Sequence, residues 1–494
     1  MQLHHRAPLF EKLAAHSRRN AVSLHVPGHK SRESVYPGAW EHYGGMLNID
    51  LTEIPGLDDL HHPEGAIKEA QELAADCFGA EETLFLVGGS TAGNLAMIMA
   101  VCRPGDLLIV QRDVHKSVIH GLTLAGARAV FITPRYDEHT GLTIGLRLQD
   151  VEDGLNRYPE AKALFVTNPS YYGLAADLSS LAKLLHSRGK LLLVDEAHGA
   201  HFGFHPALPS SALAAGADAV VQSTHKMLTA MTMGAMVHLQ GERLNRRLLR
   251  KALAMLQSSS PSYPIMASLD LSRRLLAEQG MELMKQSMQT IKDIRVWISE
   301  QRRWKVWEIP DSLLSEGFRQ DFFKLVLSDA SDKLSGYAIK EQLELHGCYP
   351  ELADPKHVLC VFTLASTVKD VKRLADALAE IDKATEGLLS SEGVFAQVES
   401  AAMEGSISEP VAFGWNQIEE EIEEVEMIPV AGSAGRKAAE MIVPYPPGIP
   451  VLYPGERITK RTAVYLERLV ILGSRFHGYD VAKSGRVPVY QAGE

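Results

Sequence analysis

The sequence lacks the features that mark secreted proteins, metal-ligating modules and basic nucleic-acid-binding proteins. Its 494 residues include only four cysteines, Cys77, Cys102, Cys348 and Cys360, which are scattered and form no CxxC pair. Neither a disulfide framework nor a zinc site is therefore expected. Basic residues are outnumbered, with 50 Lys plus Arg against 61 Asp plus Glu and a net charge of −11. This balance excludes a nucleic-acid binder that depends on an overall positive field.

Long apolar runs are also missing. The first residues contain no continuous apolar stretch of the signal-peptide type, and no run in the chain is long enough to span a bilayer. We therefore expect a cytoplasmic protein that binds no metal, no membrane and no nucleic acid.

The sequence does contain ample material for a buried core. Hydrophobic residues make up 46% of the chain and charged residues 22%, which is average for a globular protein and excludes disorder as the dominant state. The length fits about three units of ordinary size, or one large domain with smaller ones attached. The acidic balance mildly favours a cationic ligand.

Short apolar runs alternate with helix-length segments through the first half of the chain. A helical pattern over 67–78 ends at Gly79, where a glycine favours termination. The alternation predicts an α/β fold, with a mostly parallel sheet covered by helices on both faces and ligands bound at the carboxyl ends of the strands. The predicted strands are 84–87, 107–110, 129–132, 163–166, 191–194 and 219–221.

Changes in composition divide the chain into four parts. They are an arm around one short helix (1–45), a large domain (46–265), a small α+β domain (266–385) and a C-terminal domain (386–494). In the small domain we expect helices over 269–276 and 291–303 and strands over 323–327 and 358–364. The Glu-rich stretch 385–425 predicts a linker followed by a charged helix.

The most informative motif follows the last predicted strand and reads Val221-Gln222-Ser223-Thr224-His225-Lys226. Burial at a strand end lowers the pKa of a lysine, which favours a nucleophilic amine that can form a Schiff base with an aldehyde cofactor. Asp195 ends the neighbouring predicted strand. A carboxylate there would keep a pyridine nitrogen protonated and so make the ring an electron sink.

Two further motifs complete the set. The segment Val87-Gly88-Gly89-Ser90-Thr91-Ala92-Gly93-Asn94 offers glycines, hydroxyls and helix N–H groups to a phosphate, and it is not a Walker A loop. His115 follows another strand, where an imidazole can lie flat on a cofactor ring. Taken singly, such residues are more often a surface lysine, a helix cap or a structural histidine. Their occurrence together after neighbouring strands favours a cofactor site.

These motifs, in this order, resemble the fold-type-I branch of pyridoxal-phosphate (PLP) enzymes. More closely, the chain resembles the bacterial Orn/Lys/Arg decarboxylases in their short form without an N-terminal wing domain, from Phe10 to about Arg461. The motifs that carry the resemblance are His25-Val26-Pro27-Gly28-His29-Lys30, Gly56-Leu57-Asp58-Asp59-Leu60-His61, His115-Lys116-Ser117, Asp195-Glu196-Ala197-His198-Gly199-Ala200-His201, Ser223-Thr224-His225-Lys226, Ser258-Ser259-Ser260-Pro261-Ser262-Tyr263, Pro444-Tyr445-Pro446-Pro447-Gly448-Ile449-Pro450 and Pro454-Gly455-Glu456.

The resemblance implies a seven-stranded sheet in the large domain and a role for each matched residue. Lys226 would form the Schiff base with the cofactor, pyridoxal 5′-phosphate, Asp195 would hold its ring nitrogen, and His115 would stack on the ring. The phosphate would be held by Ser90, Thr91, Ser223 and His225.

The resemblance also implies a homodimer with shared active sites, assembly beyond a dimer being left open. Ser258 and Ser260 would reach the phosphate from the neighbouring subunit, and Glu456 would bind the distal cation of the substrate. His198 departs from the family, which often carries an aromatic residue three positions after the Asp, so its contacts with the cofactor ring are expected to differ.

The function implied is decarboxylation of a basic L-amino acid, arginine, lysine or ornithine, to the amine and CO2, and the resemblance leans towards arginine or lysine. Another fold-type-I PLP lyase or an aminotransferase is the alternative, although no motif singles out an arginine for the α-carboxylate. A non-catalytic relative is disfavoured by the intact Lys226 and Asp195. A nucleotide-binding protein using the 88–93 loop is disfavoured by the missing P-loop lysine.

Overall fold

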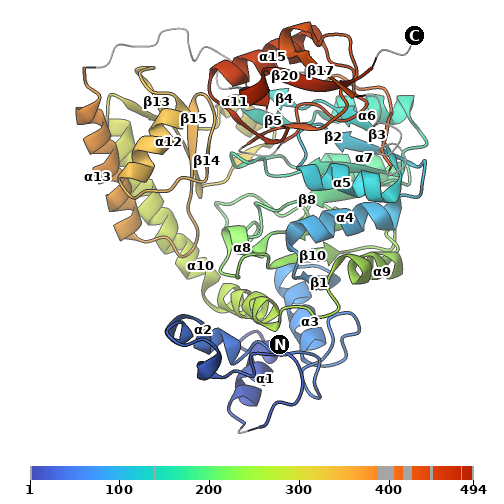
Figure 1. The fold of residues 1–494 in the computed structure, drawn as a ribbon, viewed down its shortest axis with the longest axis vertical. Helices are drawn as coiled ribbons and strands as arrows, with labels where there is room; N and C mark the ends of the chain where they lie inside the picture. The colour runs from blue at the N-terminus through green and yellow to red at the C-terminus, as the bar shows by residue number, and fades with distance from the viewer. Residues whose placement is uncertain are drawn as a thin grey trace.

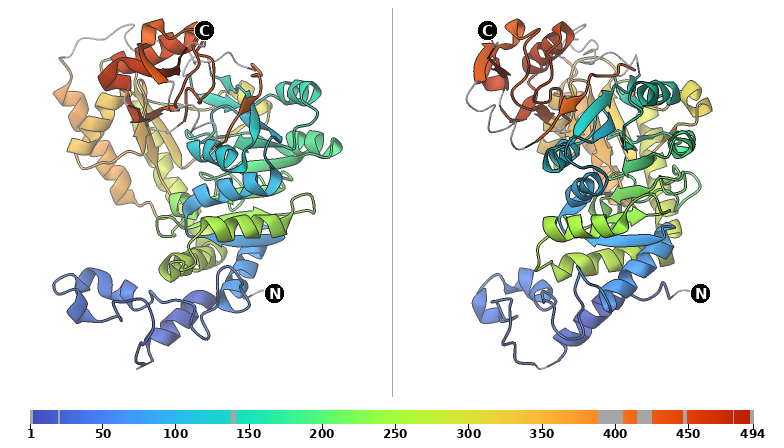
Figure 2. Two further views of the ribbon diagram at one scale, coloured as in Figure 1. Left: turned by 45° about the vertical axis from the view of Figure 1, so that its right-hand side comes forward. Right: turned by 90° about the vertical axis from the view of Figure 1, so that its right-hand side faces the viewer.

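The computed structural model describes residues 3–19, 21–137, 141–387, 405–414, 425–445, 449–479 and 481–491. A large α/β body forms the middle of the molecule, and a second, smaller sheet lies beside it (Figure 1). The N-terminal segment projects at one end and the C-terminal region covers the other, as the turned views also show (Figure 2). The four domain boundaries expected from the sequence stay predictions.

The large body is built on one mixed sheet of eight strands among the described residues. Its order is β1 (Glu82–Leu86), β10 (Ala235–Leu239), β9 (Ala219–Gln222), β8 (Leu191–Asp195), β6 (Ala163–Thr167), β2 (Leu107–Gln111), β3 (Arg128–Ile132) and β16 (Val411–Ala412). The five strands from β9 to β3 are parallel, whereas β10 runs antiparallel to both neighbours and β16 is antiparallel to β3. The α/β class and all six predicted strands are confirmed.

The predicted seven strands of the large domain are confirmed, since seven strands of this sheet come from residues 82–239. The sequence reading did not locate β10, and the eighth strand, β16, is a two-residue strand contributed by the C-terminal region. It extends the sheet edge at β3.

Both faces of the sheet are buried, which explains why its strands read as unbroken apolar runs. In β8, Leu193 points into one core, and its neighbours Leu192 and Val194 point into the other. The first core is closed by α4 (Gly89–Val101), α5 (Lys116–Ala125) and α9 (Arg246–Leu256). The second is closed mainly by α3 (Ala66–Phe78), α6 (Leu148–Arg157), α7 (Ser179–Ser187) and α10 (Tyr263–Glu300).

Helix α10, with 38 residues, connects the large body to the small sheet. It begins at Ser262, whose side chain accepts from the N–H of Ile265, and it joins into one helix the two stretches predicted as separate. The small sheet has the order β11 (Trp304–Val306), β13 (Lys324–Asp329), β15 (His357–Val361) and β14 (Leu352–Ala353), all antiparallel. It is covered by α12 (Gly336–Leu345) and α13 (Val368–Ala384). The two strands predicted here are confirmed as β13 and β15.

The N-terminal segment contains more structure than the single helix predicted. It has α1 (Pro8–Ser17), the 3₁₀ turn η1 (Glu33–Val35) and α2 (Trp40–Leu47). Two fully buried side chains of α10 hold its start: Arg273 donates to the carbonyls of His4 (2.8 Å) and Arg6 (2.6 Å), and Asp270 accepts from the N–H of Leu9 at 2.9 Å.

The C-terminal region has a core of its own, which includes Ile442, Leu466 and Val487. Its elements are β17 (Val425–Pro429), η3 (Val430–Gly432), β18 (Ile442–Tyr445), α15 (Lys460–Ile471), β19 (Arg475–Gly478), α16 (Val481–Ser484) and β20 (Arg486–Tyr490). Most of the predicted Glu-rich linker and helix, and Pro446–Gly448 of the tail motif, lie outside the described residues.

Short elements complete the described chain. They are β4 (Arg135–Tyr136), β5 (Thr143–Gly145), β7 (Leu174–Ala175), α8 (Thr224–Met227), α11 (Asp311–Ser315) and β12 (Arg319–Gln320). Over the ranges that the structure describes, no helix combines the length and the apolar character needed to cross a membrane.

Candidate active site

The predicted residues of the large domain gather at the carboxyl edge of the parallel strands, where α/β sheets bind ligands. His115 follows β2, Asp195 ends β8, and Ser223 to Lys226 follow β9, with α8 starting at Thr224. From the small sheet, Lys324 at the start of β13 contacts the same region through His198.

Lys226 is largely buried at this edge. Its Nζ lies 3.1 Å from Nε2 of His198 and 5.8 Å from the ring centroid of Tyr171. Burial lowers the pKa of Lys226, against the opposing charges of Asp195 and Glu351. A lysine in such surroundings gives up its proton more easily than an exposed one and becomes a nucleophile.

Asp195 is held from helix α4. Its Oδ2 accepts from Nδ2 of Asn94 at 2.7 Å, and its Oδ1 accepts from the N–H of Ala197 at 3.0 Å. The residue is 3% exposed. Because a carboxylate has about four lone-pair sites, Asp195 keeps the capacity to accept one more hydrogen bond from a ligand.

The hydrogen bonds around His115 fix its tautomer. Asn94 Nδ2 donates to Ser117 Oγ (3.0 Å), so the Ser117 hydroxyl donates its own proton to His115 Nδ1 (2.9 Å), which also accepts from the N–H of Ser117 (3.2 Å). Burial lowers the pKa of His115 to about 4. The imidazole is therefore neutral near pH 7, with its proton on Nε2.

We call Asp195, Asn94, Ser117 and His115 the ring end of the site. Their side chains form one continuous hydrogen-bonded chain from the Asp195 carboxylate to the His115 imidazole. One polar atom of the ring end, Asn94 Oδ1, is buried and has no partner among the described residues. Sequence reasoning named Asn94 and Ser117 only as motif letters, because their function depends on a contact between α4 and α5.

We call the N-terminus of α4 with Ser90, Thr91, Ser223 and His225 the anion end. The first turn of α4 has no side-chain cap and no acidic residue. The N–H of Gly89 donates to the carbonyl of Met233 at 2.9 Å, and the N–H groups that follow it, with the helix dipole, remain available to an anion. Ser223 Oγ is buried and has no hydrogen-bond partner among the described residues, and the same holds for Oγ1 of Thr224 next to it. Such atoms are expected where a polar ligand belongs.

Gly93 lets α4 pack directly on the strand that leads to Lys226. A Cβ at this position would collide with the Val221 side chain of β9 and lie 2.9 Å from Cδ1 of Leu86 in β1. The close approach fixes the first turns of α4 against the end of β9, which brings Ser90 and Ser223 to the same side of the sheet.

His225 completes the anion end. Its Nδ1 donates to the carbonyl of Gly234 at 2.9 Å, so Nε2 is the atom left for a ligand. Burial lowers the pKa of His225, and the nearby charge of Lys226 acts in the same direction. A bound dianion would oppose both effects and favour the protonated, donating imidazole.

His198 lies between two lysines. Its Nδ1 is 3.1 Å from Lys324 Nζ, its Nε2 is 3.1 Å from Lys226 Nζ, and the Tyr171 ring lies 4.7 Å away between centroids. Burial, followed by the charges of Lys226 and Lys324, holds the pKa of His198 well below its usual range. Lys324 and Tyr171 were missed because no local pattern indicates that these segments reach the sheet edge.

Ser258 and Ser260 lie on an exposed loop. Ser258 Oγ accepts from the N–H of Ser260 at 3.1 Å, and its carbonyl is 2.9 Å from His61 Nε2. No hydrogen bond of the described residues joins either serine to the anion end of its own chain. The loop nevertheless begins beside it, because Gln257 Oε1 accepts from the N–H of Val87 at 2.8 Å.

The Glu456 carboxylate already has bonding partners within the chain. Its Oε1 lies 2.5 Å from Arg112 Nη2, and its Oε2 accepts from the N–H of Tyr453 at 3.2 Å. Arg112 directly follows β2, so Glu456 lies at the same edge of the sheet as His115. Among the described residues, the Glu456 carboxylate contacts Arg112 and the N–H of Tyr453 and bonds to none of the other predicted site residues. Its role towards a substrate stays a prediction.

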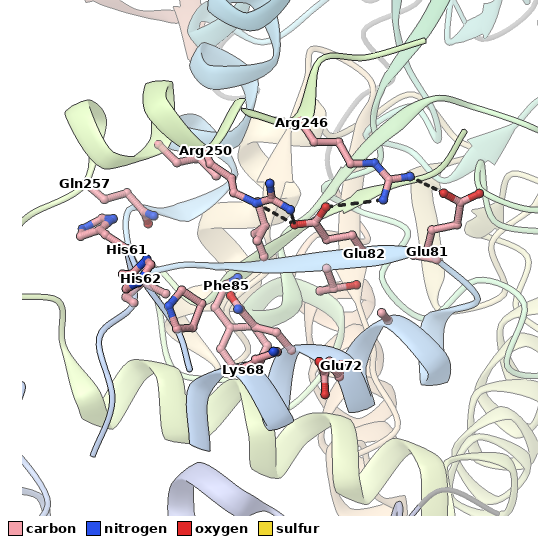
Figure 3. Close-up of a pocket in the computed structure, with 18 of the residues that line it drawn as sticks. His61, His62, Lys68, Glu72, Glu81, Glu82, Phe85, Arg246, Arg250 and Gln257 are labelled. Atoms are coloured by element: carbon pink, nitrogen blue, oxygen red, sulfur yellow. Dashed lines mark hydrogen bonds and ion pairs between the residues drawn. The ribbon is translucent and has the colours of Figure 1, made fainter. Parts of the chain in front are cut away.

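A separate hollow lies between α3, β1 and α9 (Figure 3). Its arginines are paired: Arg250 with Glu82 at 2.5 Å, and Arg246 with Glu81 and Glu82. None of the predicted site residues lines it. Ion-paired walls of this kind leave little uncompensated charge for a ligand, so we do not assign the hollow to the active site.

Comparison with known proteins identifies the family. Residues 7–329 match the family model described as Orn/Lys/Arg decarboxylase, major domain, and residues 415–493 match Orn/Lys/Arg decarboxylase, C-terminal domain. An uncharacterised protein of Bacillus subtilis, YaaO, is 39% identical over 98% of both chains. An arginine decarboxylase of Bacillus anthracis is 36% identical over 95% of this chain and 94% of its own.

The fold is also that of solved relatives. The structure of the constitutive lysine decarboxylase of E. coli superposes with a TM-score of 0.81 at 21% identity, covering 99% of this chain and 82% of the other. That likeness shows the fold alone, a fold-type-I α/β architecture. The match of the major-domain model to well over half of the chain decides membership: the protein belongs to the Orn/Lys/Arg decarboxylase family, a family of PLP-type amino-acid decarboxylases.

Proposed function

We propose that this protein decarboxylates a basic L-amino acid, arginine, lysine or ornithine, to the corresponding amine and CO2, with pyridoxal 5′-phosphate as its cofactor. The observation that carries the proposal is the position of Lys226 and Asp195 at the ends of the neighbouring strands β9 and β8, where an amine of lowered pKa feels the charge of a carboxylate held by α4. Family membership supports the same reaction class.

The residues present fit the cofactor. A phosphate would satisfy the buried Ser223 hydroxyl and the uncapped N-terminus of α4, with His225 Nε2 and Ser90 beside it. Lys226 would hold the aldehyde carbon, Asp195 would accept a hydrogen bond from the ring nitrogen, and His115 would lie on the ring. Bound in this way, the cofactor supplies an electron sink for the pair of electrons left when CO2 departs.

The chain's own residues do the remaining work. Asp195, stabilised as an acceptor by two N–H donors, keeps the ring nitrogen protonated. Lys226, as an ammonium, is the candidate to donate a proton to the substrate carbon, and a protonated histidine beside it is another, while the neutral His115 would serve as the ring contact. The buried His198 limits the access of water to one side of the Lys226 amine.

We further infer a cytoplasmic homodimer with shared active sites. Ser258 and Ser260 are exposed beside the anion end without bonding to it, which suits a contact with the phosphate of a neighbouring subunit. The N-terminal segment exposes large apolar side chains, among them Val22 (76% exposed) and Leu24 (91%), which a partner would cover. The four cysteines are free thiols, as in proteins of reducing compartments.

Glu456 remains our candidate for the distal cation of the substrate. Since Arg112 already occupies its carboxylate, the substrate's ammonium or guanidinium would have to displace or share that pair. This competition predicts that Arg112→Met raises the affinity for the substrate cation, whereas Glu456→Gln lowers it.

The proposal is tested with the purified full-length protein, pyridoxal 5′-phosphate and each of the three amino acids. We expect CO2 release with an equimolar amine, identified by mass, from at least one of them. Lys226→Ala should release none and should show no imine absorbance band. Keto-acid formation without CO2 would instead identify an aminotransferase, and an active Lys226→Ala protein would refute the assignment of Lys226.

A further inference from the structure

A second lysine, Lys324, is completely enclosed next to the candidate active site. It is 0% exposed, and its stem packs against the backbone of Gly173, where a Cβ would lie 2.5 Å from Lys324 Cγ. Gly173 has a φ of +86°, so this close contact is built into the turn. The packing holds Lys324 Nζ at 3.1 Å from His198 Nδ1.

The donor and acceptor atoms of His198 limit how many protons the two lysines can carry together. A neutral imidazole has one N–H donor and one acceptor nitrogen. Both ring nitrogens of His198 face a lysine amine at 3.1 Å. If one lysine is an ammonium that donates to His198, the opposite nitrogen carries the ring proton and must donate to a neutral amine. If both lysines were ammonium groups, one of them would face the N–H of the His198 ring and would have no acceptor there.

We propose that Lys324 is a positioning residue that takes up, through His198, the proton that Lys226 must lose to become a nucleophile. The inference rests on the proposed function, because it takes Lys226 as the amine that reacts with the cofactor aldehyde. It assigns a role to Lys324, a residue of the small domain that acts on Lys226 through the His198 imidazole.

The transfer balances without any further reactant. The Lys226 ammonium gives a proton to His198 Nε2, while the proton on His198 Nδ1 passes to the neutral Lys324 amine. The products are a neutral Lys226, a Lys324 ammonium and the other tautomer of His198, with no change in total charge.

Each of the two lysines has a carboxylate nearby that favours its protonated form, Asp195 for Lys226 and Asp321 for Lys324. Asp321, three residues before it, has an oxygen, Oδ2, that is buried without a hydrogen-bond partner among the described residues. Its Oδ1 is shared by His201 Nε2 and the N–H of Phe323, both at 3.0 Å. On the other side, both oxygens of Asp195 already accept N–H bonds. The carboxylate beside Lys324 therefore keeps an oxygen able to stabilise a proton on Lys324.

The other titratable groups facing this chain act on both lysines or on Lys226. Glu351 favours a proton on either lysine, and His115, His225 and the Tyr171 ring face Lys226 or His198. Burial is the main reason that the pKa of Lys324 falls to about 8, and the positive charge of Lys226 contributes to it. The two lysines thus compete for one proton across His198.

The test measures Schiff-base formation rather than turnover. Full-length protein freed of cofactor is mixed with pyridoxal 5′-phosphate over a range of pH, the imine is read by absorbance, and borohydride trapping with peptide mass assigns it to Lys226. In Lys324→Met, which keeps an apolar stem of similar size, Lys226 should retain its proton. We expect the pH midpoint of imine formation to rise by about one unit or more.

Controls separate this role from a structural one. Lys305→Met, at an exposed lysine in β11 of the same sheet, should leave the midpoint unchanged. His198→Phe should raise the midpoint as Lys324→Met does, and the double variant should add little, which keeps the test open if Lys324→Met fails to fold. A folded Lys324→Met protein with the wild-type midpoint would overturn the inference. Absence of any imine at Lys226 in the wild type would overturn the proposed function itself.

Discussion

The two ends of the candidate site are built in opposite ways. At the ring end, Asp195, Asn94, Ser117 and His115 are linked by hydrogen bonds of 2.7–3.0 Å, and only Asn94 Oδ1 lacks a partner. At the anion end, the Ser223 and Thr224 hydroxyls are buried without one, and the first turn of α4 has no cap.

The difference shows which half of the site is completed by folding and which by a ligand. An unpaired buried polar group costs about 1–3 kcal/mol, so the unpaired hydroxyls of the anion end lower the stability of the ligand-free chain. A ligand that binds only the folded state returns that stability as it binds. We therefore expect the ring end to control rate and fold, and the anion end to control cofactor affinity.

Asp195→Asn should produce the largest effect, and its main effect should be on the rate. An amide accepts the Asn94 bond but cannot hold the pyridine nitrogen protonated, so we expect kcat to fall by about 10³-fold. Cofactor affinity, set at the anion end, should change little. Steady-state assays and a titration with pyridoxal 5′-phosphate measure both, and a variant within tenfold of wild type would break the assignment of the ring end.

Asn94→Ala tests whether the ring end supports the fold. It leaves Asp195 Oδ2 and Ser117 Oγ without their donor, and we expect the free energy of unfolding of the cofactor-free protein to fall by about 1–3 kcal/mol. Urea unfolding measures it. Asn156→Ala, at an exposed residue that accepts from Arg188, is the matched control and should change stability by less than about 0.5 kcal/mol.

Ser223→Ala should distinguish the two ends, because it should not lower the free energy of unfolding as Asn94→Ala does. Because its hydroxyl has no partner in the ligand-free chain, its removal should leave the free energy of unfolding unchanged or slightly higher, in contrast to Asn94→Ala. The dissociation constant for pyridoxal 5′-phosphate should rise about tenfold with the loss of one charge-assisted hydrogen bond. Equal destabilisation by both variants would remove the distinction between the two ends.

The last expected effect is a change in the pH dependence of stability at His115. Burial lowers its pKa from 6.5 to about 4 in the folded protein, so between these values the unfolded chain binds a proton that the folded chain does not. This contribution to stability is present above pH 6.5, declines towards pH 4, and is lost below it.

His115→Gln cannot titrate. The pH dependence of its unfolding free energy over that window should be shallower by up to about 1.4 kcal/mol per pH unit. Urea titrations of the cofactor-free protein at several pH values give the slope. An unchanged slope would mean that His115 is solvated rather than buried at the ring end.

Much of the fold could be predicted because buried parallel strands leave a simple signal. Six strands were found as apolar runs, whereas β10 was missed because it carries His238, an interior histidine that pairs with Gln222 at 3.1 Å and with Thr83 at 2.8 Å. The two-residue β16 is too short to produce any pattern.

The residues of the candidate site likewise fall into those that the sequence predicts and those that it does not. Residues after successive strands converge by topology alone, so His115, Asp195 and Lys226 could be grouped from the sequence. Lys324 and Tyr171 reach His198 only through the packing of the small domain and a loop, which no periodicity encodes.

Gly93 gives the site a property that none of its polar residues supplies. By letting α4 lie directly on β9, it sets a fixed separation between the helix terminus and the amine of Lys226. The site therefore has two binding positions at a set distance from each other, one for an anion and one for a carbonyl carbon. We therefore expect an aldehyde whose phosphate arm is longer or shorter than this separation to bind more weakly.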